Sequence, residues 1–156
     1  MPTDDRFPLD LADPSRGPTA SQASGLTLNA ATTLIKAAKA EARSAGVPIS
    51  VAIVDGGGQL VAFERMDGAD LVTIMLAQDK AWTSVVNRMP TRDLAPLVQP
   101  GAEFYGYESI GRGRTIVFAG GMPLERDGVL VGGVGVSGGS VDEDQRIVDA
   151  AVAAFG

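Results

Sequence analysis

Two basic side chains, Lys80 and Arg65, are the residues of this sequence best suited to binding or proton transfer. Lys80 stands alone among small and apolar residues on one face of a helix predicted over about residues 69–88. A lysine in such surroundings can have a lowered pKa or can hold a carboxylate. Arg65 shares one face of a predicted strand with Val61 and Phe63. The two cations predict an anion-binding site, and the alternative is a salt bridge between neighbouring elements.

A loop after this helix gathers most of the other functional groups. It holds both tyrosines of the chain, two glutamates and two arginines. Binding and catalytic residues are disproportionately found on loops. Phe104 and Tyr105 are therefore predicted to line a ligand site, while Lys80, Tyr105 and Glu103 are the candidates for proton transfer. The alternative for Glu103 is a solvent-exposed carboxylate without a catalytic role.

Two residue types are missing, and their absence narrows the chemistry. The chain has no cysteine and no histidine. Thiolate nucleophiles, disulfides, Ser-His-Asp triads and nearly all imidazole-based metal sites are thereby excluded. The acidic run 142–144 opens a predicted helix, where carboxylates complement the helix dipole, so we predict no metal site. Any chemistry must come from the remaining side chains, the backbone or a cofactor.

The run 133–138 matches the GxGxxG pattern of dinucleotide-binding loops. Too few residues follow it for the further strand that such a fold needs, and carboxylates in the next helix would repel a pyrophosphate. In an alternating strand, Gly133, Gly135 and Ser137 face one way, and Val134 and Val136 the other. Each glycine weakens a strand by about 0.5–1 kcal/mol. The stripe therefore indicates either a closely packed helix or a ligand.

Size and charge exclude several classes of protein. The chain has 156 residues, of which 45% are hydrophobic, so we expect one domain with a real core. A net charge of −6 without any run of Lys or Arg excludes nucleic acid and anionic membranes as partners. No apolar stretch approaches the roughly 20 residues of a membrane span. The N-terminal residues lack the layout of a signal peptide, so we expect a cytoplasmic protein.

The remaining pattern predicts an α+β fold in which helices pack on an antiparallel sheet. Residues 1–25, rich in proline, are predicted to form an extended arm, and residues 26–156 the domain. In the helix over 69–88, one stripe is predicted to face the core, namely Leu71, Ile74, Met75, Trp82, Val85 and Met89. The opposite, small-residue face is expected to be a subunit interface or a pocket wall. Helices are predicted over about residues 28–45, 69–88, 91–98 and from 140 onward, and strands over 49–55, 59–66, 115–119 and 129–137, with a turn at 120–124.

Five stretches, taken in order, also resemble a known family. They are AIVDGGGQLV (52–61), RMDG (65–68), KA (80–81), GGMPL (120–124) and VGGVGVSG (131–138). Together they resemble the GlcG/HbpS-like family, which includes haem-binding proteins and the C-terminal domain of PduO-type cobalamin adenosyltransferases. The resemblance implies a profilin-like layered fold with a sheet of about five strands. It also implies oligomers, often octamers, and haem or corrinoid-related ligands with redox sensing.

These observations predict an oligomeric protein that binds a small organic ligand, namely an anionic metabolite. One alternative is an enzyme of small-molecule catabolism, an isomerase or lyase with proton transfer by Lys80, Tyr105 or Glu103. Another is haem or corrinoid binding, in which Met66, Tyr105, Tyr107 or Lys80 would replace histidine as an iron ligand. A further alternative is a structural oligomer without ligand. The predicted ligand-binding residues are Arg65, Lys80, Phe104, Tyr105, Gly120, Gly121 and Ser137.

Overall fold

Four strands and three long helices form three layers in the computed structural model, which describes residues 25–155. The strands β1 (Ser50–Asp55), β2 (Leu60–Arg65), β3 (Gly121–Arg126) and β4 (Val129–Ser137) build one antiparallel sheet in the order β2-β1-β4-β3. The predicted α+β class is confirmed, with four strands in this part of the chain where the resemblance implied about five. The predicted arm lies, apart from Gly25, outside the described residues.

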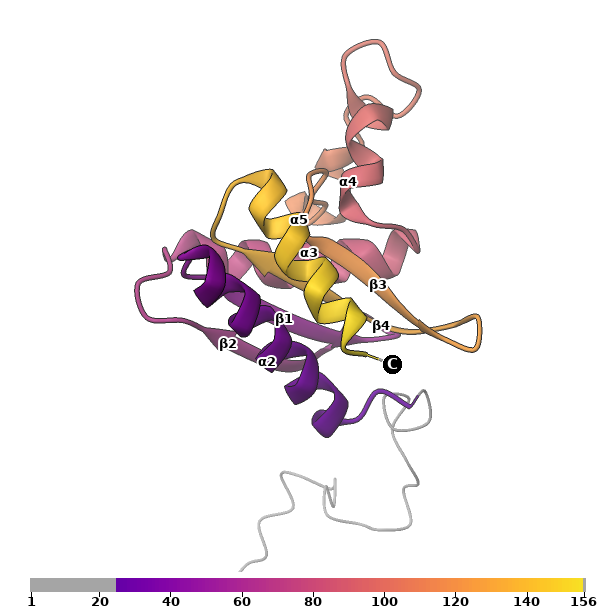
Figure 1. Cartoon of the computed structure of the whole chain (residues 1–156). Coiled ribbons are helices and arrows are strands. Elements are labelled where there is room, and N and C mark those ends of the chain that lie inside the picture. Colours follow the sequence, from indigo (N-terminus) through magenta and orange to yellow (C-terminus); the bar gives the residue numbers. More distant parts are fainter. Residues whose placement is uncertain (1–24, 156) are drawn as a thin grey trace, which may run out of the picture.

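The helices α2 (Leu28–Ala45) and α5 (Val141–Ala153) cover one face of the sheet, and α3 (Val72–Asn87) covers the other (Figure 1). The larger core cluster joins α2 and α5 to side chains such as Val51, Ile53, Val134 and Val136. A smaller cluster joins Ala52 and Val54 of β1 to α3. Alternation along β1 and β4 therefore supplies both cores from the same two central strands.

The residues predicted to begin α2 and α5 and to end α2 do so in the structure. Thr27 caps α2, and Gly46 ends that helix in the left-handed conformation at a φ of 70°. Ser140 and Glu143 form the predicted capping box at the start of α5. The hairpin between β1 and β2 turns at Asp55, whose side chain accepts hydrogen bonds from the backbone N–H groups of Gly57 and Gln59.

The orientation of α3 is the main correction to the sequence prediction. The N-terminal part of the stripe expected to face the core is exposed, with Leu71 at 74% and Met75 at 57% of full exposure, whereas Val85 of the same stripe is buried as predicted. The small-residue face, which includes Ala77, Lys80 and Ser84, packs on the sheet instead. The reason lies in β4, where a Cβ atom added at Gly135 would stand 2.0 Å from the carbonyl oxygen of Ala77. Opposite Gly135, the helix and the sheet are therefore too close for a side chain larger than that of Ala77.

A second correction concerns the segment before β3. Residues 115–119, predicted as a strand, are irregular, and the predicted turn at 120–124 falls largely within β3. The backbone N–H of Ile116 donates to the Thr83 hydroxyl at 3.0 Å, so this segment is bound to α3 rather than to the sheet. Pro123 is tolerated in β3 because that strand lies at the sheet edge.

The connection from α3 to β3 contains the short helices α4 (Thr91–Leu94), η2 (Ala95–Val98) and η3 (Tyr107–Gly113). The first two agree with the helix predicted over residues 91–98. In Figure 1 the part of the chain around α4 projects beyond the three layers. Across residues 25–155, no helix combines the length and the apolar character that a membrane crossing requires.

Candidate functional site

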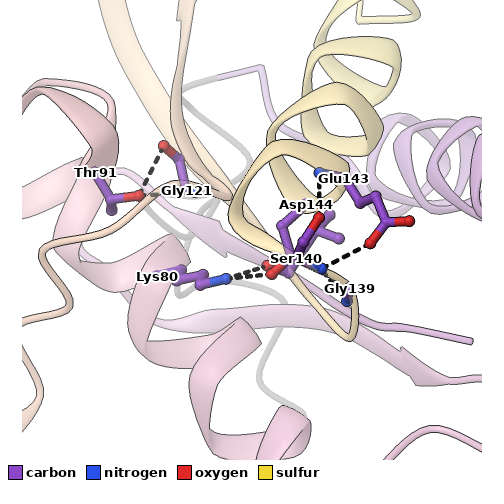
Figure 2. Close-up of polar contacts among 8 residues, drawn as sticks. Lys80, Thr91, Gly121, Gly139, Ser140, Glu143 and Asp144 are labelled. Atoms are coloured by element: carbon purple, nitrogen blue, oxygen red, sulfur yellow. Dashed lines mark hydrogen bonds and ion pairs between the residues drawn. The ribbon is translucent and has the colours of Figure 1, made fainter. Parts of the chain in front are cut away.

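Lys80 is enclosed in the interior and forms an ion pair with Asp144. Its side chain has 0% exposure, and its Nζ lies 2.6 Å from Oδ2 of Asp144 and 2.9 Å from the carbonyl oxygen of Val136 (Figure 2). The ring of Phe118 lies 5.0 Å from the same nitrogen. Burial lowers the pKa of Lys80 and raises the pKa of Asp144, while the attraction between the two charges opposes both shifts.

Gly120, Gly121 and Ser137 gather around this ion pair. A Cβ added at Gly120 would meet the Lys80 Nζ at 2.8 Å, and one at Gly121 would meet the Lys80 carbonyl oxygen at 2.4 Å. The N–H of Gly121 donates to the Thr91 hydroxyl at 3.0 Å (Figure 2). Ser137 is buried and follows the carbonyl that Lys80 contacts. The structure thus brings four of the predicted site residues together, in a polar cluster inside the protein.

Arg65 lies elsewhere, on the exposed end of β2. It lines a surface hollow of about 320 Å³ with Lys39 and Arg43 of α2, together with Glu64, Met66 and Asp67. We call this the basic hollow, because three cations face two carboxylates on a chain whose net charge is −6. Lys39 is ion-paired with Glu64. Within residues 25–155, the guanidinium groups of Arg43 and Arg65 contact no carboxylate at ion-pair distance.

A second surface hollow, larger than the basic hollow, was not foreseen from the sequence. It measures about 460 Å³ and runs along the exposed side of α3; we call it the α3 groove. Leu71, Ile74 and Met75 form its apolar wall, and Gln78, Asp79 and Arg114 its polar wall. Arg114 donates from Nε to Asp79 at 2.8 Å, and its guanidinium stacks 4.6 Å from the Trp82 ring. The apolar stripe of Leu71, Ile74 and Met75 would have predicted the groove if it had been placed on the surface rather than in the core.

The remaining predicted residues belong to the projecting connection. Tyr105 is 66% exposed, Glu103 is exposed, and Phe104 lines a separate pocket described below. Because Lys80 is fully enclosed, these loop residues do not share a surface site with it. The three candidates for proton transfer are therefore not brought together. Among the described residues, no cluster of three His, Cys, Asp or Glu side chains is placed to hold a metal ion.

The chain forms a layered α+β domain, with surface hollows along α3 and at the edge of the sheet. The chain belongs to the HbpS-like family, whose model, described as haem degrading protein HbpS-like, matches residues 26–153. The family resemblance seen in the sequence is thereby confirmed.

Three relatives illustrate the likeness. The corrinoid adenosyltransferase PduO of Salmonella typhimurium is 46% identical over 122 residues, which cover 78% of this chain and 36% of PduO. The structure of a PduOC–haem complex matches with a TM-score of 0.81 at 44% identity, covering 83% of this chain and 94% of that one. A double mutant of HbpS from Streptomyces reticuli matches with a TM-score of 0.78 at 36% identity, covering 84% and 87%. The chain thus spans about a third of PduO.

Proposed function

We propose that this protein binds a haem-type tetrapyrrole, and that the α3 groove is the site. The likeness to PduOC carries the proposal, because that relative has been crystallised with haem and matches 83% of this chain at 44% identity. The family description and the HbpS relative support the same ligand class. The predicted anionic character of the ligand is retained, since haem carries two carboxylates.

The donor atoms decide which surface fits an iron porphyrin. With no histidine or cysteine in the chain, an iron ligand must be a methionine, tyrosine or lysine. Lys80 is engaged in its buried ion pair, and the Tyr107 hydroxyl donates to Asn87 at 2.6 Å. Met75 is 57% exposed and lines the α3 groove. Its thioether is the donor best placed for a ligand of this size.

The volume, the apolar wall and the cation of the groove also suit the ring and the carboxylates of a porphyrin. Its volume of about 460 Å³ lies within the range of about 300–1,000 Å³ typical of ligand sites. Leu71 and Ile74 offer an apolar wall to the ring, and Arg114 offers a cation to a carboxylate. Thioether ligation raises the reduction potential of haem iron. The bound group would therefore supply redox chemistry at a raised potential.

A titration of the protein with haem, followed by its visible absorption, tests the proposal. We expect saturable binding by the wild type and at least a tenfold weaker complex with a changed spectrum in Met75→Ala. Met66→Ala is the matched control, because Met66 lines the basic hollow instead. An unchanged spectrum in Met75→Ala would show that the iron ligand is not Met75 of α3. The absence of saturable binding by the wild type would reject the haem proposal.

The basic hollow supports a second candidate, the binding of a small anionic metabolite. The observation that favours it is the pair Arg43 and Arg65, whose guanidinium groups have no ion-pair partner in residues 25–155. Arginine binds carboxylates through two parallel hydrogen bonds. Calorimetric titration with a set of small dicarboxylates should show binding that the Arg43→Ala/Arg65→Ala variant loses and that Arg114→Ala keeps. Binding that survives the double substitution would exclude the hollow.

We also propose that the protein is a homo-oligomer, with the octamer that the resemblance implies as the expected assembly. Leu71, Val72 and Met75 are 74%, 54% and 57% exposed, and all three lie within the first turn of α3 or directly before it. Apolar side chains of this size, gathered on one exposed face, are typical of surfaces that bind a partner. A second copy packed beside the α3 groove would complete its open side.

A further inference from the structure

A smaller pocket lies between the end of α3 and the connection that projects from the fold. Its volume is about 170 Å³. Five apolar residues line it, from α4, η2 and the loops beside them: Met89, Leu94, Leu97, Val98 and Phe104. Asn87 and Tyr107 complete the wall. We call it the Tyr107 pocket, and it shares no lining residue with the α3 groove or the basic hollow.

The lining contains no charged side chain, which sets this pocket apart from the other two. Asp79 and Arg114 line the α3 groove, and five charged residues line the basic hollow. Burying an unpaired ion in an apolar site is costly, because nothing there replaces its hydration. An anionic metabolite or a haem carboxylate would find no partner in the Tyr107 pocket. The ligand that it fits is neutral.

The only polar feature of the lining is the contact between Tyr107 and Asn87. The Tyr107 hydroxyl donates to Oδ1 of Asn87 at 2.6 Å, and the Asn87 Nδ2 donates to the Thr83 carbonyl at 2.9 Å. The second N–H of this amide and the lone pairs of the Tyr107 oxygen have no partner among residues 25–155. One hydroxyl group on a ligand could accept from the amide and donate to the phenol oxygen.

The size and the shape of the walls limit the rest of the ligand. An apolar cavity of about 150 Å³ in another protein stays dry and accepts benzene. Phe104 and Tyr107 meet edge to face, with ring centroids 6.2 Å apart and planes at 69°, an arrangement that suits a further aromatic ring. Leu97 and Phe104 are 38% and 49% exposed, so an occupant would cover apolar surface that now faces solvent.

We propose that the Tyr107 pocket binds a small neutral aromatic molecule with one hydroxyl group, a phenol or a benzylic alcohol. The ring would lie against Leu94, Leu97 and Phe104, and the hydroxyl would join the contact between Asn87 and Tyr107. This site is separate from the tetrapyrrole site, so either proposal can fail without the other.

The methionines of the chain provide a direct test on the wild-type protein. Its five methionines are Met1, Met66, Met75, Met89 and Met122, and Met89 alone lines the Tyr107 pocket. With 13C-labelled methionine methyl groups, titration with phenol should shift the Met89 signal saturably and leave Met66, Met75 and Met122 in place. Benzoate, which has a similar ring but a negative charge, should leave Met89 unmoved. A wild-type Met89 signal that phenol does not shift would overturn the proposal.

Two variants test the walls and the polar contact. Leu97→Trp fills the pocket and should weaken phenol binding at least tenfold, whereas Leu60→Trp, at a leucine of β2 that is 52% exposed, should not. Tyr107→Phe keeps the ring and removes the hydroxyl, so the preference for phenol over toluene should fall about tenfold while toluene still binds. Phenol binding that Leu97→Trp leaves intact would place the ligand elsewhere. Loss of self-association in Leu97→Trp, with no phenol binding by the wild type, would make the pocket an interface between copies.

Discussion

Lys80 and Asp144 are 64 positions apart in the sequence, and their ion pair at 2.6 Å connects the two sides of the sheet. Lys80 comes from α3 and donates to the carbonyl of Val136 near the end of β4, and Asp144 comes from the first turn of α5. The other oxygen of Asp144 accepts from the N–H of Gly139 at 2.9 Å. Lys80 and Asp144 therefore fix α3, the end of β4 and the start of α5 relative to one another. This role is structural, because the enclosed Lys80 side chain is not accessible to a ligand.

Removing one partner of this ion pair should destabilise the fold strongly. Lys80→Met leaves the Asp144 carboxylate buried without its counter-charge, and such losses cost about 3–5 kcal/mol of unfolding free energy. Lys39→Met is the matched control, because it breaks the exposed ion pair with Glu64 and should cost about 1 kcal/mol or less. Urea unfolding followed by circular dichroism measures both. Equal losses in the two variants would contradict the structural role of Lys80.

The close approach of α3 to β4 gives a second prediction. In Gly135→Ala, the new methyl group would stand 2.0 Å from the Ala77 carbonyl oxygen, so the helix must move, and we expect a loss of more than about 2 kcal/mol. Gly56→Ala is the control, since its Cβ would lie 3.4 Å from the nearest atom, in ordinary contact. The same unfolding assay compares them. A Gly135→Ala protein as stable as wild type would mean that another element explains the glycine stripe.

The sequence predicted most elements of the fold because their signals are local. The capping box at Ser140, the stop at Gly46 and the turn after Asp55 each depend on residues within a few positions. The division of β4 into a glycine face and a valine face also followed from alternation alone. Of the two explanations for the glycines, the structure supports the closely packed helix.

The orientation of α3 could not be predicted in the same way, because it depends on a partner far along the chain. Leu71, Ile74 and Met75 look like a core stripe by hydrophobicity, yet the surface that receives α3 is β4, more than 50 positions away, and its glycines admit only small side chains. The predicted site failed to gather around Arg65 for a similar reason. For Lys80 the structure shows the alternative left open by the sequence, a salt bridge between elements, and its partner Asp144 was interpreted from the sequence only as a complement to the helix dipole.

Glu143 gives a prediction on pH. Hydrogen bonds from the Ser140 backbone and side chain lower the pKa of Glu143 below its ordinary value of 4.5. The unfolded chain therefore binds more protons between the two pKa values, so this contribution to stability is present above about pH 4.5 and is lost as the pH falls through the lower value. The melting temperature of the wild type should fall more steeply between pH 5 and pH 3 than that of Glu143→Gln.

A second substitution separates this effect from general acid sensitivity. Ser140→Pro removes the N–H that donates to the Glu143 carboxylate at 2.8 Å, and the φ of −64° at Ser140 suits proline. In that background, Glu143→Gln should no longer change the pH profile. A difference that persists would assign the acid sensitivity to another partner of Glu143.

The exposed start of α3 gives the last prediction, on assembly. Val72 is 54% exposed, belongs to the apolar patch with Leu71 and Met75, and does not line the α3 groove. A glutamate there should dissociate the oligomer, because a carboxylate buried at the centre of an apolar interface loses its hydration without gaining a partner. Val129→Glu is the matched control, at a valine of β4 that is 62% exposed and lies outside the apolar patch. Sedimentation velocity should show a smaller species for Val72→Glu alone. The melting temperature of this variant should also no longer rise with protein concentration. If Val129→Glu dissociates the oligomer and Val72→Glu does not, the subunits meet at the β3–β4 hairpin, and the apolar patch on α3 serves the tetrapyrrole site only.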